Sequence, residues 1–150
     1  MKKTVFIDID GTLRNSERKV TKETINAVDL ARKNGYQIIL CSGRSREHCI
    51  NVSKEINASS YIINSNGAEG YNYLDKKVVF QDLYTNEDKD FLWNFAKENN
   101  LGIAFNCDNV RYITQNYPYK SPKDQDITFD KIEDMYNKKI VQAVLGRSKF

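Results

Sequence analysis

The sequence lacks the long apolar runs that a membrane protein needs. In its 150 residues, no apolar stretch reaches the roughly 20 residues of a membrane-spanning helix. The chain begins with two lysines, and Thr4–Ile7 is its only apolar stretch before Asp8, which is too short for the core of a signal peptide. We therefore expect a cytoplasmic protein that is neither secreted nor inserted in a membrane.

Cysteine and histidine are also scarce. The three cysteines, Cys41, Cys49 and Cys107, are odd in number and form no CxxC pair, which argues against a disulfide framework or a structural zinc site. The single histidine, His48, cannot anchor a multi-histidine metal site. Reduced thiols in a cytoplasmic protein are the simplest interpretation.

No block of like charges stands out. The 23 Lys and Arg residues and the 20 Asp and Glu residues are interspersed, and the net charge is only +3. A nucleic-acid-binding protein would show a basic stripe, so we expect no nucleic-acid partner. A hydrophobic content of 40% is enough for a packed core, and the length suits one domain or two small ones.

The first half of the chain alternates strand-like and helix-like segments. We predict strands over 4–9, 36–41 and 61–63, a helix capped by Thr21 and stopped at Gly35, and a helix capped by Ser45 that runs to about Asn57. Strands and helices that alternate through short connections are typical of an open parallel α/β sheet.

The pattern changes after Gly67. We predict a hairpin over 71–81, strands over 102–106, 111–114 and 139–145, a loop over 116–126, a helix from Asn86 or Glu87 to about Asn99, and a helix capped by Thr128. The first of these helices would bury Phe91, Leu92, Phe95 and Ala96, and the second Ile132, Met135 and Tyr136. We place a domain boundary near Asp82–Thr85.

The segment Asp8-Ile9-Asp10-Gly11-Thr12-Leu13 is the most informative part of the chain. It follows an apolar strand, and ligands of open α/β sheets bind beyond the carboxyl ends of the strands. Asp8 and Asp10 would share one face, where two carboxylates repel unless a cation lies between them or one is protonated. Oxygen ligands of this kind suit Mg²⁺. A plain acidic turn is the alternative, but an acid in a buried strand needs a partner.

Two segments together resemble the haloacid dehalogenase superfamily of phosphotransferases. Asp8–Leu13 is similar to its first signature, and Cys41-Ser42-Gly43-Arg44 is similar to its second. The resemblance implies that Asp8 is the nucleophile and a metal ligand, and that Asp10 is the general acid/base and a second ligand of Mg²⁺. Phosphate would be held by Asp10, Gly11, Thr12, Ser42 and Gly43, with Arg44 as a further candidate. Taken alone, Ser42-Gly43 would be an ordinary turn.

A third segment points to one branch of this superfamily. Ile62–Ala68 resembles the end of the third strand in the Cof-type (IIB) phosphatases, which makes Asn66 a candidate for lining the site, although Asn66-Gly67 also suits an ordinary turn. The resemblance implies an α/β fold with a partial Rossmann-like parallel core over residues 1–83. A partial α/β (C2-type) cap would follow over residues 84–150.

The family pattern contains more than this chain does. It includes a later lysine and a later acidic pair, which normally follow the cap. Asp126 and Asp130, preceded by Lys120 or Lys123, have a plausible spacing, but no apolar strand leads into them. A loop and a solvated first helical turn explain these acids better. The chain therefore resembles the N-terminal portion of the family pattern.

The resemblance implies hydrolysis of small phosphorylated metabolites, such as sugar phosphates, through an aspartyl-phosphate and with Mg²⁺. One alternative is a non-catalytic fragment that binds phosphate or Mg²⁺, which the missing lysine and acids favour. Another is a phosphomutase of the same superfamily, which would not release inorganic phosphate. A receiver-type switch fits less well, because Asp10–Leu13 has no place in that pattern.

The first strand has a further implication. In the family it is central in the sheet, so without the later strands Thr4–Ile9 would be an apolar edge. An apolar edge is a template for pairing with another chain. We therefore expect self-association or a complementing chain that covers Thr4–Ile9.

Overall fold

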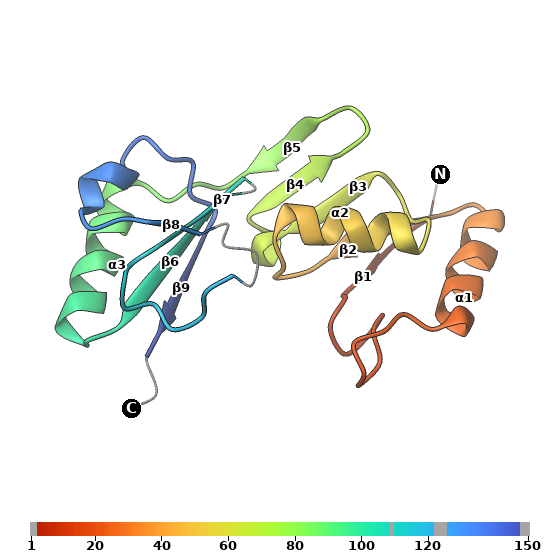
Figure 1. Cartoon of the computed structure of the whole chain (residues 1–150). Coiled ribbons are helices and arrows are strands. Elements are labelled where there is room, and N and C mark those ends of the chain that lie inside the picture. Colours follow the sequence, from red (N-terminus) through yellow and green to blue (C-terminus); the bar gives the residue numbers. More distant parts are fainter. Residues whose placement is uncertain (1–2, 109, 122–125, 148–150) are drawn as a thin grey trace. The chain divides into compact units, whose positions relative to one another are not determined.

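The computed structural model describes residues 3–108, 110–121 and 126–147. The chain forms two compact units, Met1–Gln81 and Asp82–Phe150 (Figure 1). The division between these units lies next to the domain boundary that the sequence analysis places near Asp82–Thr85. Among the described residues, no helix has the length and apolarity to cross a membrane.

The first unit is built on a five-stranded sheet with the order β1-β2-β3-β4-β5. Its strands are β1 (Lys3–Ile7), β2 (Tyr36–Cys41), β3 (Tyr61–Asn64), β4 (Glu69–Asn72) and β5 (Lys77–Gln81). The first three run parallel, whereas β4 is antiparallel to both of its neighbours. The predicted α/β class is confirmed, with a parallel part followed by an antiparallel hairpin.

Two helices connect the parallel strands, α1 (Lys22–Lys33) and α2 (Arg46–Glu55). The hydroxyl of Thr21 caps α1 by accepting from the backbone N–H of Thr24 at 3.2 Å, as the sequence predicts. Both helices pack against the sheet around one core (Figure 1). Its buried members are Ile9, Leu13, Val28, Ile38, Leu40, Cys49, Val52, Ile56, Ala58 and Ile62.

Strand β1 lies at the edge of this sheet. It pairs with β2 on one side, and no strand of the described residues pairs with it on the other. Phe6, in the second half of this strand, is 59% exposed. The sequence expectation of an apolar edge strand at this place therefore agrees with the structure.

The second unit has a four-stranded sheet with the order β8-β7-β6-β9. Its elements are α3 (Asn86–Glu98), β6 (Gly102–Cys107), β7 (Val110–Ile113), β8 (Asp126–Thr128), a 3-10 turn (Ile132–Met135) and β9 (Gln142–Gly146). Phe129 packs against Trp93 and Phe105, with ring centroids 5.5 and 5.8 Å apart. These three rings form the centre of a core that is separate from that of the first unit.

The predicted inner face of α3 is wrong in part. Phe91 and Phe95 are 68% and 41% exposed and stack on each other, while Lys89, Trp93 and Ala96 are buried. The ammonium of Lys89 donates to the carbonyls of Tyr136 and Lys138, at 3.3 and 3.1 Å. A lysine is buried only where its ammonium has such hydrogen-bond partners. These bonds fix the rotation of α3 about its own axis and therefore which of its side chains face the core.

The predicted helix cap at Thr128 is also wrong. Thr128 ends β8, a strand parallel to β7 that the sequence does not predict, and the expected helix shrinks to the 3-10 turn. The guanidinium of Arg111 binds both carboxylate oxygens of Asp126, at 2.8 and 2.7 Å, and ties this segment to β7. Ile132 and Met135 are buried as predicted, and part of the predicted loop, 122–125, lies outside the described residues.

Candidate active site

The chain turns sharply after β1. The N–H of Leu13 donates to the carbonyl of Asp8 at 3.3 Å, and the N–H of Arg14 donates to that of Ile9 at 3.0 Å. Ile9 and Leu13 are buried, so they anchor the turn and leave the residues between them in solvent. Gly11 adopts a φ of 80°, a left-handed conformation that favours glycine.

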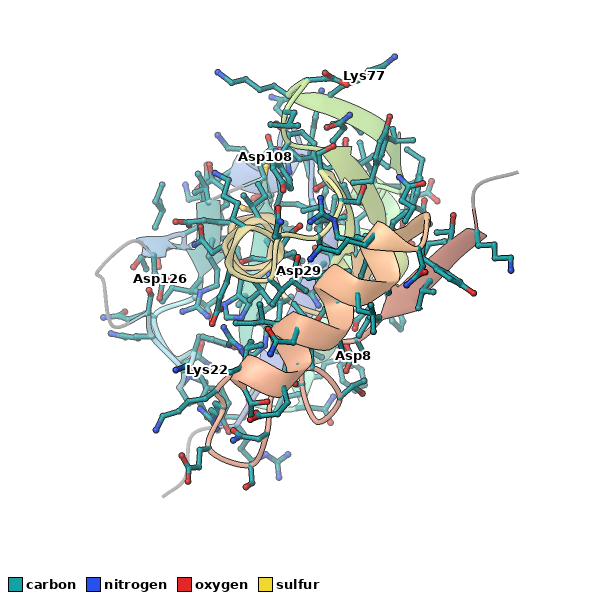
Figure 2. All side chains as sticks on the ribbon, turned by 90° about the vertical axis from the view of Figure 1, so that its right-hand side faces the viewer. Asp8, Lys22, Asp29, Lys77, Asp108 and Asp126 are labelled. Atoms are coloured by element: carbon teal, nitrogen blue, oxygen red, sulfur yellow. The ribbon has the colours of Figure 1, made fainter. Side chains whose placement is uncertain are left out.

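The structure places Asp8 just beyond the last residue of β1, in an exposed position (Figure 2). The expectation of a buried strand acid is wrong, because β1 ends at Ile7, two residues before the predicted end of the strand at residue 9. Among the described residues, no group donates a hydrogen bond to this carboxylate. Asp8 is therefore free to meet a ligand from solvent.

Asp10 forms an ion pair with Arg44. The Nε and Nη2 atoms of Arg44 donate to the two carboxylate oxygens at 2.8 and 2.9 Å. The hydrogen bond from Arg44 lowers the pKa of the Asp10 carboxyl below its usual value, so this side chain is ionised at neutral pH. Since β1 and β2 are parallel neighbours, this pair joins the turns at their carboxyl ends.

Ser42 begins the turn after β2 and is buried. Its N–H donates to the carbonyl of Ile63 at 3.0 Å, and its hydroxyl oxygen accepts from the N–H of Arg44 at 3.4 Å. Its carbonyl accepts from the N–H of Asn66 at 3.3 Å. Ser42 thus links the turn after β2 to the turn after β3.

Gly43 and Asn66 are in close approach. A Cβ atom at Gly43 would lie 2.4 Å from the side-chain oxygen of Asn66, which is nearer than real Cβ atoms come to another heavy atom. Asn66 holds a φ of 59°, a left-handed conformation that asparagine tolerates better than most residues. The structure therefore brings Asn66 against Gly43, whereas Thr12 lies exposed on the turn after β1.

Sequence reasoning missed a second pair near Asp10. The Nη1 atom of Arg14 donates to the Nε2 atom of His48 at 3.1 Å, and Arg14 also lies 3.8 Å from the carboxylate of Glu55. Burial, together with the charges of Arg14 and Arg44, lowers the pKa of His48, which keeps the imidazole neutral and able to accept. The position of Arg14 directly after the first motif was the only sequence signal for it.

The residues partly fit a divalent cation. Mg²⁺ is commonly held by one or two carboxylates together with phosphate oxygens and water, and Asp8 offers one exposed carboxylate. Both oxygens of Asp10 are engaged by Arg44, and no group of three or more His, Cys, Asp and Glu side chains gathers within the part of the chain that the structure describes. Asp126, the alternative acid, binds Arg111 in the second unit instead.

Residues 5–146 match the family of haloacid dehalogenase-like hydrolases. The chain is 26% identical over 105 residues to the 5-amino-6-(5-phospho-D-ribitylamino)uracil phosphatase YcsE of Bacillus subtilis, an alignment that covers 67% of this chain and 40% of that protein. It is 29% identical over 100 residues to the phosphatase YwpJ of the same organism, covering 61% and 35%. The chain thus spans 35% to 40% of the length of these two curated relatives.

Solved structures share the fold. A haloacid dehalogenase-like hydrolase from Bacteroides thetaiotaomicron superposes with a TM-score of 0.79 at 18% identity, over 97% of this chain and 58% of that one. A sugar phosphatase of subclass IIB superposes with a TM-score of 0.76 at 20% identity, over 95% and 58%. The resemblance to the superfamily drawn from the sequence is confirmed: the chain belongs to the haloacid dehalogenase-like hydrolases.

Proposed function

We propose that this chain carries the nucleophile half of a Mg²⁺-dependent phosphatase that acts on small phosphorylated metabolites, such as sugar phosphates. The observation that carries the proposal is the exposed carboxylate of Asp8 at the end of β1, beside the turn that holds Ser42 and Arg44. The phosphatase names of relatives such as YcsE and YwpJ support it.

In the proposed reaction, a carboxylate oxygen of Asp8 attacks phosphorus, and the bond from phosphorus to the leaving oxygen breaks. Water then hydrolyses the aspartyl-phosphate, which releases phosphate and restores Asp8. Asp10 donates a proton to the leaving alkoxide in the first step and removes one from water in the second.

Arg44 has to move for this cycle to run. While Arg44 holds both oxygens of Asp10, the low pKa of Asp10 disfavours the protonated form that the first step uses. A phosphate dianion suits the planar guanidinium at least as well as a carboxylate does. Binding of the substrate phosphate would therefore draw Arg44 away from Asp10. The pKa of Asp10 would then rise, which favours the protonated form that donates to the leaving group.

Phosphate would be bound mostly by backbone and hydroxyl groups. The N–H groups of Gly11, Thr12 and Gly43 lie in turns at the carboxyl ends of β1 and β2, and the hydroxyl of Ser42 lies in the turn after β2. These turns lie near the start of α2, where the helix dipole favours an anion. Asn66 would line the same place through its contact with Gly43.

Mg²⁺ would be held by the carboxylate of Asp8 and the backbone carbonyl of Asp10, which are hard oxygen donors. When bound, the ion would neutralise charge on the phosphoryl oxygens. While Arg44 binds both carboxylate oxygens of Asp10, that side chain is not available to the metal, so the backbone carbonyl of Asp10 is the expected ligand.

The test is turnover of p-nitrophenyl phosphate and a panel of sugar phosphates with Mg²⁺, in the parent chain and in Asp8→Asn. We expect Asp8→Asn to lose at least about 1,000-fold in kcat, as removal of a covalent nucleophile does. Asp126→Asn is a matched control in the second unit and should leave turnover unchanged. Phosphate transfer without release of inorganic phosphate would favour the mutase instead.

A second candidate is a chain that binds phosphate and Mg²⁺ without turnover. It is favoured by the absence, among the described residues, of a third acidic group near Asp8 and Asp10. Calorimetric titration of a folded sample with orthophosphate, with and without Mg²⁺, separates the two. Binding in a sample that shows no turnover would establish this second function.

We also propose that the edge of β1 pairs with a strand of another chain, either a second copy or a complementing chain. The exposed Phe6 and the open side of β1 support the proposal. Sedimentation should show an assembly that Phe6→Lys weakens. A parent chain that remains monomeric at high concentration, alone and in cell extract, would contradict it.

A further inference from the structure

Three consecutive residues after β3 adopt left-handed backbone conformations. Ser65, Asn66 and Gly67 have φ values of 52°, 59° and 93°. Serine is strained in this region, although asparagine tolerates it better, so such a turn persists only when its surroundings hold it in place. The turn also forms part of the candidate site, because the N–H groups of Ser65 and Asn66 donate to the carbonyls of Arg44 and Ser42, at 3.0 and 3.3 Å.

A buried carboxylate lies beside this turn. Glu69, on β4, is 1% exposed, and its two oxygens accept four hydrogen bonds. Oε1 accepts from Arg46 at 2.7 Å and from Asn64 at 2.8 Å. Oε2 accepts from Arg46 at 2.5 Å and from Gln81 at 2.8 Å.

Each donor belongs to a different segment of the unit. Arg46 is the first residue of α2 and follows Arg44 by two positions, and its guanidinium also covers the ring of Tyr71 at 4.4 Å. Asn64 ends β3 and accepts from the hydroxyl of Ser65 at 2.9 Å. Gln81 is the last residue of the first unit.

The carboxylate remains charged in this environment. Burial alone would raise the pKa of Glu69, but the hydrogen bonds from Arg46 and Asn64 hold that pKa below its usual value. A buried and fully bonded ion pair adds little net stability compared with apolar packing. Its value lies in fixing the positions of the groups that it joins.

We propose that Glu69, acting through Arg46 and Asn64, is a positioning residue of the candidate phosphate site. It fixes the strained turn Ser65–Gly67 against the start of α2, so that Asn66 lies against Gly43 and the carbonyls of Ser42 and Arg44 are engaged. In naming phosphate as the ligand, this inference rests on the proposed function. The fixing of the turn does not depend on it.

The first test is amide hydrogen exchange measured by NMR in the parent chain and in Glu69→Gln. Glutamine keeps the shape of Glu69 but has only one accepting oxygen. Since hydrogen bonds to charged groups are the strong ones, we expect the amides of Ser65 and Asn66 to exchange about 10- to 100-fold faster. The amide of Val28 in α1 should change by less than about threefold, because that helix is outside the network.

The matched control is Asp126→Asn, which breaks an equally bidentate pair with Arg111 in the second unit. It should leave exchange at Ser65 and Asn66 unchanged. If Glu69→Gln leaves those two amides unchanged, the proposal is overturned. Equal acceleration at Val28 would also overturn it, because Glu69 would then support the whole unit rather than the turn.

The second test is the affinity of the folded protein for orthophosphate with Mg²⁺, measured by calorimetry. We expect Glu69→Gln to weaken binding about 10-fold, and to raise KM more than it lowers kcat wherever the parent chain turns over. A parent chain without phosphate affinity would refute the proposed function. The hydrogen-exchange result would then still decide whether Glu69 fixes the turn Ser65–Gly67. Unchanged affinity in Glu69→Gln would refute a positioning role toward phosphate.

Gln81→Ala keeps the inference testable if Glu69→Gln does not fold. It removes one of the four hydrogen bonds to Glu69 from a half-buried position. We expect exchange at Ser65 and Asn66 to rise about three- to tenfold, in line with the loss of one hydrogen bond. No change at either amide would overturn the inference.

Discussion

Two arginines that lie two positions apart in the sequence form the same kind of ion pair in opposite surroundings. Arg44 binds Asp10 where the side chains are 48% and 43% exposed, whereas Arg46 binds Glu69 where they are 10% and 1% exposed. An exposed pair contributes little to stability and can exchange partners. A buried pair cannot be broken without leaving an uncompensated charge. The exposed pair is thus suited to taking part in a reaction, and the buried pair is suited to holding the surrounding structure in place.

The largest expected effect comes from breaking the buried pair. Arg46→Met leaves the Glu69 carboxylate buried without its main partner, so we expect a loss of roughly 3 kcal/mol in the free energy of unfolding. Arg44→Met breaks the exposed pair and should cost less than about 1 kcal/mol. Urea unfolding followed by far-UV circular dichroism measures both. Similar losses of unfolding free energy in the two variants would show that the difference in exposure does not determine how much each ion pair contributes to stability.

The second prediction concerns the pKa of Asp10. Because Arg44 lowers this pKa, their pairing stabilises the fold above the usual carboxyl pKa and loses that contribution as the pH falls through the lowered pKa. In Arg44→Met the pKa of Asp10 should rise toward its usual value, as measured by NMR titration of the side-chain carboxyl. Orthophosphate added to the parent chain should shift it in the same direction. An unchanged pKa in the variant would show that Arg44 does not control this acid.

A smaller effect is expected at Gly43, where the two regions meet. Gly43→Ala would place a methyl group 2.4 Å from the side-chain oxygen of Asn66, so Asn66 has to move. We expect a cost of about 1 kcal/mol in unfolding free energy, with weaker phosphate binding. The double variant with Asn66→Ala should recover part of the stability, and a double-mutant cycle measures this coupling. Strict additivity would contradict the contact.

The smallest expected effect concerns two cysteines that differ in burial, as the two ion pairs do. Cys49 is fully buried, and burial raises the pKa of its thiol to about 12. Cys41 is only half-buried at the end of β2. At pH 8 we expect iodoacetamide to modify Cys49 at least about tenfold more slowly than Cys41, as followed by mass spectrometry of peptides. Equal rates would show that α2 opens readily.

Local patterns predicted the framework of the first unit. The bounds of β2 and the Thr21 cap of α1 follow from an apolar run that begins after Gly35 and from a hydroxyl before a helical period. The turns that hold Asp10 and Ser42 follow from their motifs. In each case the information lies within a few residues of the feature.

The features that the sequence did not predict depend on distant partners. Lys89 is buried because carbonyls 47 and 49 positions later accept hydrogen bonds from it. The sequence around Lys89 does not predict these two distant partners. Arg46 and Glu69 are 23 positions apart, and each alone is typical of a solvated surface. Asp8 was misjudged for a different reason: β1 ends at Ile7 instead of at residue 9, so Asp8 lies beyond the strand in an exposed position.

The position of Trp93 has a consequence for how the chain can be observed. It is the single tryptophan of the sequence, it is 9% exposed in the core of the second unit, and the ammonium of Lys97 lies 4.5 Å from its ring. Its fluorescence therefore reports on the second unit and not on the first, whereas circular dichroism reports on both. Unfolding curves that coincide by the two methods would mean that the units melt as one cooperative block. Curves that separate would give each unit its own transition in a single experiment.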